Sequence, residues 1–119
     1  ARLCYPDRPV LLVSGDGAMT FTVAELECAA RQRLPFVALV ADDQAWGITK
    51  LGHQRQFGAP ISSDLGPIDF ALLAQALGCH GVRVDTAEGI APALRRALDA
   101  DRPTVVHVPI VGGNEWRNS

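Results

Sequence analysis

Residues 10–17 read Val-Leu-Leu-Val-Ser-Gly-Asp-Gly, an apolar β-type run that ends in a Gly-Asp-Gly turn. A second apolar run, residues 36–41, is followed by Asp-Asp-Gln-Ala-Trp-Gly at residues 42–47. One helix-length amphipathic stretch separates the two runs, which is the pattern of a βαβ unit. Because a right-handed crossover makes the two strands parallel, their carboxyl ends open onto the same edge of the sheet. The pattern therefore predicts that Asp16 and Asp43 face one crevice.

The chemistry of these two segments suits a metal ion and a phosphate. Neighbouring strands lie about 4.8 Å apart, and adjacent corners of a Mg²⁺ octahedron with bonds of about 2.1 Å are about 3 Å apart. Asp16 and Asp43 could therefore share one ion. Gly15 and Gly17 let the backbone turn sharply and approach a phosphate. The helix start that follows supplies free N–H groups and a partial positive charge for an anion.

Strand and helix signals alternate along the chain and predict an α/β domain, a parallel β-sheet flanked by helices. Strands are expected near residues 10–14, 36–41, 81–84 and 104–108. The capping-box spacing of Thr22 and Glu25 predicts a helix that runs to about Arg33. Asp69 and Thr86 are expected to cap two later helices. These helices are expected over residues 70–77 and 87–100, with a short one near residues 48–54 and a core stripe of Ile90, Leu94, Ala97 and Leu98.

Composition limits the classes of protein. The 119 residues, nearly half of them apolar, suffice for one compact domain over residues 1–119 and are too few for a two-domain enzyme. A formal charge of −2 without a Lys/Arg cluster gives no electrostatic footprint for nucleic acid or an anionic membrane. No apolar run approaches the roughly 20 residues of a membrane span, so a cytoplasmic location is expected. Three widely spaced cysteines without a CxxC motif suit buried or inert reduced thiols: Cys4, Cys28 and Cys79.

The two ends of the chain carry weaker signals. Residues 1–9 are typical of a helix end and a turn that lead into a strand. Since there is no initiator Met, we expect a fragment of a longer polypeptide or a processed chain. The polar residues 112–115 are expected to fray.

The complete arrangement resembles the thiamine diphosphate and Mg²⁺ motif of the acetolactate synthase-like enzymes. The likeness extends to Ala-Met-Thr-Phe-Thr at residues 18–22, Glu-Leu-Glu at 25–27 and Leu-Pro at 34–35. It covers essentially the whole chain and is most specific over residues 8–47. A lone Gly-Asp-Gly would be a weak signal, because these residues are common in turns. The resemblance implies the carboxyl-terminal, thiamine diphosphate-binding domain of that family, truncated at its N-terminal side.

The resemblance also implies roles for individual residues. Asp16 and Asp43 would be side-chain ligands of Mg²⁺, and the carbonyl of Ala45 would be a main-chain ligand. Backbone groups near both turns would hold the diphosphate oxygens. The full cofactor-binding set implied by the resemblance is Gly15, Asp16, Gly17, Ala18, Asp43, Ala45, Trp46, Gly47 and Ile48.

One departure from the family concerns charge. The family most often has Asn-Asn where this chain has Asp42-Asp43. An Asp still offers an oxygen to Mg²⁺, but it adds negative charge beside a diphosphate, which is unfavourable unless a cation offsets it. Cofactor affinity is therefore expected to depend more strongly on Mg²⁺ and pH. Lys50 is the nearest basic residue in the sequence that could compensate.

Other polar and aromatic residues are expected to have ordinary roles. Asp42 is expected to be exposed or capping, Glu25 to be a helix-cap partner, and Trp46 to be a packing residue that closes the pocket. The three histidines are expected at ordinary surface or core positions, and only the first, on a long loop, could approach a substrate: His53, His80 and His107.

The family resemblance implies an enzyme that decarboxylates a 2-oxo acid and/or joins the resulting carbanion to a second carbonyl. In that family the glutamate that activates the cofactor comes from the pyrimidine-binding domain of a neighbouring subunit. A homodimer or homotetramer is therefore expected, and this chain alone is expected to be inactive. The residues leave two alternatives open. One is a non-catalytic Mg²⁺-binding α/β module of the receiver-like or regulatory type, and the other is a folded scaffold without a ligand.

Overall fold

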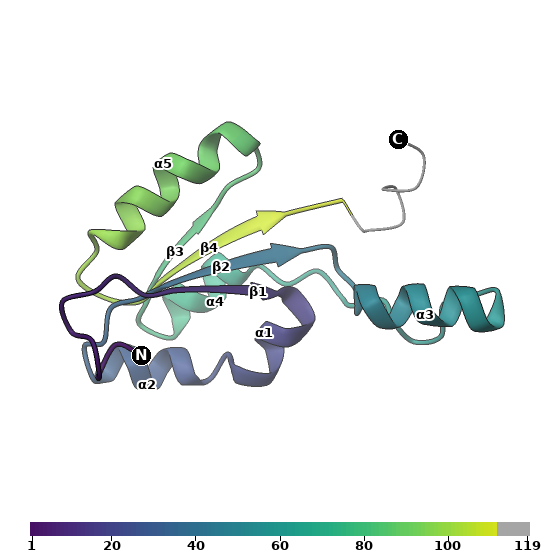
Figure 1. The fold of residues 1–119 in the computed structure, drawn as a ribbon, viewed down its shortest axis with the longest axis horizontal. Coiled ribbons are helices and arrows are strands. Elements are labelled where there is room, and N and C mark those ends of the chain that lie inside the picture. The colour runs from purple at the N-terminus through teal and green to yellow at the C-terminus, as the bar shows by residue number, and fades with distance from the viewer. Residues whose placement is uncertain (112–119) are drawn as a thin grey trace.

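The computed structural model describes residues 1–111, which form a parallel sheet with helices on both faces (Figure 1). The sheet has the strand order β1-β2-β4-β3. The expected α/β class and parallel pairing are confirmed, and the strands lie within about one residue of the expected positions. The predicted fraying of residues 112–115 falls outside the described residues. The strands are β1 (Leu11–Gly15), β2 (Val37–Asp42), β3 (His80–Arg83) and β4 (Thr104–Pro109).

Five helices complete the described fold. Three of them cover one face of the sheet and α5 covers the other, whereas α3 extends away beyond the carboxyl end of β2 (Figure 1). No residue of α3 is buried. The helices are α1 (Asp16–Thr22), α2 (Glu25–Arg31), α3 (Gly47–Phe57), α4 (Phe70–Ala76) and α5 (Ala87–Leu98).

The core has two parts because side chains alternate along the central strands. Ala38 and Val40 of β2 face α1, α2 and α4, where they pack with Phe70. Val37, on the opposite face of the same strand, packs with Ala93 of α5. Strand β4 alternates in the same way, so that both sides of the sheet are covered by helices. This coverage is typical of parallel sheets.

Two of the predicted helix caps are confirmed. The Asp69 carboxylate accepts a hydrogen bond of 3.0 Å from the Leu72 N–H at the start of α4. That hydrogen bond lowers the pKa of Asp69 below its ordinary value. The Thr86 hydroxyl accepts a bond of 3.3 Å from the Gly89 N–H at the start of α5. Both cap residues have the extended backbone that an N-cap requires.

The predicted capping box at Thr22 and Glu25 is wrong. Two short helices replace the single expected one, with Thr22 as the last residue of α1 and Glu25 as the first residue of α2. The N-cap position of α2 is Ala24, which makes no side-chain capping bond in the described structure. Val23 and Ala24 both keep right-handed helical backbone angles. Because a capping box needs an extended N-cap residue, this continuous helical path leaves no place for one.

The predicted core stripe of α5 is confirmed for three residues and wrong for Leu98. Ile90, Leu94 and Ala97 pack against the sheet. Leu98 is 45% exposed. It lies one residue beyond Ala97, which places it about 100° further round the helix and away from the sheet.

Two expectations from composition concern membrane-spanning helices and the cysteines. None of the helices in residues 1–111 is long and apolar enough to cross a bilayer. All three cysteines lie in this range and are free thiols, as expected, although Cys4 is exposed and Cys28 is half-buried. Cys79 is buried, which raises the pKa of its thiol.

The backbones of β3 and α4 lie very close together at Gly81, and this generates a prediction. A Cβ atom at Gly81 would collide with the backbone carbonyl of Ala71. Gly81→Ala is therefore expected to lower the free energy of unfolding by about 1–3 kcal/mol, which thermal unfolding of the full-length protein would measure.

Gly52→Ala is the matched control. A Cβ atom there meets nothing within 4 Å among residues 1–111, and alanine favours the helix by up to about 1 kcal/mol. An unchanged melting temperature for Gly81→Ala would show that the two backbones are not in contact in solution.

Candidate functional site

A cleft of about 480 Å³ opens at the carboxyl ends of β1 and β2. This volume lies in the range of small-molecule sites. The strand register pairs Gly15 with Ala41, so both strands end at the same level. Asp16 then begins α1, and Asp43 begins the connection to α3. The predicted shared crevice is therefore present.

All nine residues of the predicted cofactor set line this cleft. They come from the end of β1, the start of α1, the loop after β2 and the start of α3. Whether they bind a cofactor stays a prediction. The nine are Gly15, Asp16, Gly17, Ala18, Asp43, Ala45, Trp46, Gly47 and Ile48.

Sequence reasoning missed three further lining residues, Ala41, Thr49 and Ile110. Ile110 directly follows β4, which lies beside β2 in the sheet. Its backbone N–H donates a hydrogen bond of 2.8 Å to the Asp42 carbonyl. The signal was available, because the carboxyl end of every parallel strand opens on the same edge.

Backbone hydrogen bonds hold the loop after β2 against α1. The Ala45 N–H donates to Asp16 Oδ2 over 3.1 Å, which ties the two predicted motifs directly together. The Trp46 N–H donates to the Ser63 carbonyl over 2.8 Å. Gln44 has a φ of +54°, in the left-handed region that non-glycine residues seldom adopt. The loop is thus fixed at several points in an uncommon backbone conformation.

Two glycines permit close approach inside the cleft. A Cβ atom at Gly17 would meet the Trp46 ring at 2.8 Å, and one at Gly47 would meet Asp43 Oδ2 at 2.8 Å. Trp46 also packs against Phe21, with ring centroids 5.2 Å apart, so its predicted packing role is confirmed. These glycines let the backbone line the cleft beside a ring and a carboxylate.

Negative charge is concentrated at Asp16. Its side chain is buried, and this burial raises the pKa of its carboxyl above the ordinary value of 3.8. A hydrogen bond from the Gly17 backbone acts in the opposite direction. The neighbouring carboxylates of Asp42 and Asp43 raise the pKa of Asp16 further. A cation placed here would relieve the repulsion among the three groups.

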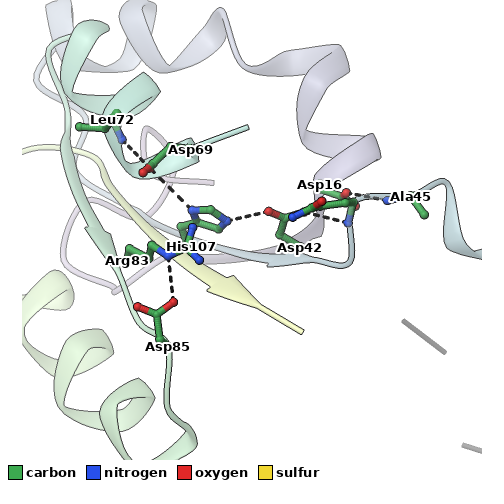
Figure 2. A network of polar contacts seen from close by, with 9 residues as sticks. Asp16, Asp42, Ala45, Asp69, Leu72, Arg83, Asp85 and His107 are labelled. Atoms are coloured by element: carbon green, nitrogen blue, oxygen red, sulfur yellow. Dashed lines mark hydrogen bonds and ion pairs between the residues drawn. The ribbon is translucent and has the colours of Figure 1, made fainter. Parts of the chain in front are cut away.

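The expectation for Asp42 was wrong in part. Its side chain is buried, with only 6% of its surface exposed. Its Oδ2 lies 2.8 Å from Nε2 of His107, and its Oδ1 caps the loop by accepting a bond from the Gln44 N–H. Figure 2 shows Asp42 between His107 and Asp16. His107 does occupy a core position, as expected, but it is linked to the cleft through Asp42.

The other basic side chains named in the sequence analysis are engaged in other contacts, two of them on α3 and one far from the cleft. Lys50 Nζ lies 2.6 Å from Asp64 Oδ1 in an ion pair. His53 Nδ1 lies 3.0 Å from the Ser63 hydroxyl. His80 pairs with Asp101 at the surface, at the opposite end of the sheet from the cleft. The positive charge of Lys50, suggested above to compensate for the extra negative charge of the Asp42-Asp43 pair, is therefore paired with Asp64.

The family model described as "Thiamine pyrophosphate enzyme, C-terminal TPP binding domain" matches residues 1–108. The chain belongs to this family. Thiamine pyrophosphate and thiamine diphosphate are two names for one cofactor, so the resemblance found in the sequence is confirmed.

Relatives of the thiamine pyrophosphate enzyme family match most of this chain. The catabolic acetolactate synthase of Raoultella terrigena is 34% identical over 110 residues, 92% of this chain and 20% of that protein. The sulfoacetaldehyde acetyltransferase of Castellaniella defragrans is 34% identical over 113 residues, 89% of this chain and 18% of that protein. The chain thus spans about a fifth of the length of these relatives.

A solved structure gives the same answer for the fold. The Rhodococcus jostii RHA1 thiamine diphosphate-dependent 4-hydroxybenzoylformate decarboxylase matches with a TM-score of 0.87 and 32% sequence identity. The match covers 93% of this chain and 21% of that chain. The α/β domain described above is therefore the fold of thiamine pyrophosphate enzymes.

The residues of the cleft fit a Mg²⁺ ion that is bound together with a diphosphate. Among residues 1–111, no group of three or more His, Cys, Asp or Glu side chains is arranged to hold a metal. Mg²⁺ is commonly held by one or two carboxylates, with phosphate oxygens completing its shell. Asp16 and Asp43 would supply the two carboxylates, and the glycines would leave room for the phosphates.

The raised pKa of Asp16 generates a prediction for the protein without metal or cofactor. Because the folded-state pKa is raised, the ionised carboxyl destabilises the fold at neutral pH, and this penalty disappears as the pH falls towards the unfolded-state value of 3.8. Asp16→Asn is expected to raise the melting temperature at pH 7, because it removes the buried charge. The difference should shrink as the pH falls.

The control is Asp7→Asn, which replaces an exposed carboxylate far from the cleft. Thermal unfolding across a pH series in a metal chelator measures both variants. A stability difference for Asp16→Asn that is independent of pH, or of opposite sign, would contradict a raised pKa for Asp16.

Proposed function

We propose that this chain is the diphosphate- and Mg²⁺-binding part of a thiamine diphosphate-dependent enzyme that acts on a 2-oxo acid. The enzyme decarboxylates the acid, joins the resulting fragment to a second carbonyl, or does both. One observation carries the proposal. The two segments of the family motif meet in one cleft and are tied together by the hydrogen bond from Ala45 N–H to Asp16.

Each part of the cleft has a role in this proposal. Asp16, Asp43 and the Ala45 carbonyl hold Mg²⁺, and the backbone around Gly17 and Gly47 holds the diphosphate. Since Gly47, Ile48 and Thr49 all line the cleft, the free N–H groups at the start of α3 lie beside it. The bound cofactor supplies the carbon nucleophile for the reaction, whereas the protein supplies binding, orientation and electrostatics.

The electrostatics of the cleft support a cation in particular. A carboxyl whose pKa is raised first by burial and further by two neighbouring carboxylates is stabilised in its ionised form when a positive charge is close. Lys50, the single lysine of the sequence, is paired with Asp64. A divalent metal ion is then the group best suited to offset both the carboxylates and the diphosphate.

The proposed substrate class is inferred from the names of the relatives. An acetolactate synthase, a sulfoacetaldehyde acetyltransferase and a 4-hydroxybenzoylformate decarboxylase all align with nine-tenths of this chain or close to it. The last of these names contains a 2-oxo acid. A 2-oxo acid is therefore the substrate class that we propose, with lyase or transferase as the reaction class.

The receiver-like alternative is not favoured. Family membership points to a thiamine pyrophosphate enzyme domain. A receiver domain also needs a lysine at the end of a later strand, whereas Lys50 lies on α3. The choice between the proposal, the alternative and a scaffold without a ligand can be made by calorimetric titration with thiamine diphosphate, with and without Mg²⁺. Saturable binding that requires Mg²⁺ supports the proposal, whereas Mg²⁺ binding alone supports the alternative.

A pair of substitutions tests the two proposed ligands in the full-length protein. Asp16→Ala is expected to abolish Mg²⁺-dependent cofactor binding, because it removes one of the two carboxylates proposed to hold the ion. Asp43→Asn keeps an oxygen and removes one negative charge, so binding is expected to survive and to require less Mg²⁺. Thiamine diphosphate affinity across a Mg²⁺ series measures both effects. Unchanged binding in Asp16→Ala, or complete loss in Asp43→Asn, would overturn the roles.

The active assembly is proposed to be a homodimer or homotetramer. The pyrimidine-binding domain of a neighbouring subunit completes the site, and this chain alone is inactive. Exposed apolar side chains on β1, an edge strand in this chain, support burial against further protein surface: Leu11, Leu12 and Val13.

Light scattering of the full-length protein, combined with an activity measurement, tests this assembly. We expect the active species to have at least twice the mass of one polypeptide. An active monomer at working concentration would refute the assembly.

A further inference from the structure

His107 is an unusual residue for its place in the fold. It lies on β4 in the run Thr-Val-Val-His-Val, and its side chain is fully buried. Val105, two residues earlier on the same face, belongs to the apolar core beneath α4. The ring of Phe70 meets the imidazole edge-on, with centroids 5.5 Å apart. An apolar side chain would fill this position without bringing a polar group into the core.

Only one of the two ring nitrogens is satisfied. Nε2 lies 2.8 Å from Asp42 Oδ2, and because a carboxylate only accepts, Nε2 donates the hydrogen. Nδ1 is buried and has no hydrogen-bond partner among the described residues. The nearest acidic oxygen to Nδ1, Asp69 Oδ1, is 3.8 Å away (Figure 2). Burying an unpaired nitrogen is unfavourable. The hydrogen bond to Asp42 is therefore the one favourable interaction that His107 makes and that an apolar residue at this position would lack.

Asp42 transmits this contact to the cleft. One of its oxygens faces His107, and the other accepts the Gln44 N–H over 3.0 Å. That second bond closes the turn in which Gln44 takes its left-handed conformation. The turn separates Asp43 from Ala45, the two residues of this loop that are proposed as metal ligands. The orientation of Asp42 therefore determines where the Asp43 carboxylate and the Ala45 carbonyl lie.

We propose that His107 is a positioning residue for the Mg²⁺ site: it holds Asp42, and Asp42 holds the turn that presents Asp43 and the Ala45 carbonyl. The inference rests on the proposed function, because it assigns His107 a part in the same site. His107 itself touches neither metal nor cofactor. It acts as the outer partners of metal ligands do, by orienting groups that lie closer to the ion.

His107 also keeps Asp42 away from the ion. Asp42 lies beside Asp16 and raises the pKa of its carboxyl (Figure 2). With the Nε2 donor removed, Asp42 Oδ2 loses its 2.8 Å hydrogen bond to the imidazole. It can then turn towards the ion, where it competes with Asp43 for a ligand position. The expected result is a weaker Mg²⁺ site, because Mg²⁺ demands near-ideal octahedral geometry.

The test measures the Mg²⁺ concentration needed for half-maximal thiamine diphosphate binding in the full-length protein, by calorimetry or intrinsic fluorescence. His107→Leu removes the donor and retains an apolar volume. This substitution is expected to raise the required Mg²⁺ concentration by about 10- to 100-fold, the usual cost of losing an outer partner of a metal ligand. His107→Gln retains an N–H donor at nearly the same reach and is expected to restore most of the affinity.

Val105→Ala is the matched control for a purely structural effect. It creates a cavity on the same face of β4 and in the same core, at the residue that pairs with Ala38, four positions before Asp42 on β2. We expect it to lower the melting temperature and to leave the Mg²⁺ requirement within about twofold of the original protein. A His107→Leu variant whose Mg²⁺ requirement shifts no more than that of Val105→Ala would overturn the inference.

A second route is available in case His107→Leu does not fold. Asp42→Ala removes the acceptor and should raise the Mg²⁺ requirement to a similar extent, whereas an unchanged requirement overturns the inference. Failure of the proposed function looks different, because the unsubstituted protein would then show no Mg²⁺-dependent cofactor binding. In that case both proposals are rejected. Normal binding by the unsubstituted protein, together with an unaffected His107→Leu, rejects only the role of His107.

Discussion

The parallel pairing of β1 with β2 is the constraint on which the rest of the site depends. Its register sets Gly15 opposite Ala41, so the next residues along each strand emerge at one edge of the sheet. Parallel pairing requires a crossover connection, and α1 and α2 provide it on one face. A slip of one residue would turn each side chain to the opposite face. Asp16 and Asp43 meet in one cleft because this register is kept.

Three carboxylates lie close together at the cleft, and hydrogen bonds hold two of them in place. Asp16 accepts a bond from the loop backbone, and Asp42 is held by a turn on one side and an imidazole on the other. These bonds fix the positions of the Asp16 and Asp42 side chains. The repulsion that remains makes the empty cleft less stable than a neutral one would be. A site that is costly without its ligand is well suited to bind a divalent cation strongly.

Most of the fold could be predicted from the sequence, because its signals are local. Apolar runs, helix caps and the Gly-Asp-Gly turn each lie within a few residues, and they located the strands and the crevice that Asp16 and Asp43 share. The set of nine residues, all of which line the cleft, came from the family resemblance. The division of this segment into α1 and α2 could not be predicted. Val23 and Ala24 keep helical backbone angles between the two helices, so no extended cap residue marks where α2 begins. The contact of His107 with Asp42 joins residues 65 positions apart. Its one sequence signal is a histidine in an apolar strand, which requires a buried partner.

Helix α3 has a consequence for how a ligand would be gained and lost. No residue of this helix is buried, and it extends away from the sheet (Figure 1). Little tertiary packing therefore holds it, and short helices without such packing are marginal in water. In this chain α3 should open locally while the sheet stays folded, and its amide hydrogens should exchange sooner than those of β4. A ligand at the first turn of α3 would order the helix, so part of the intrinsic binding energy is spent on local folding.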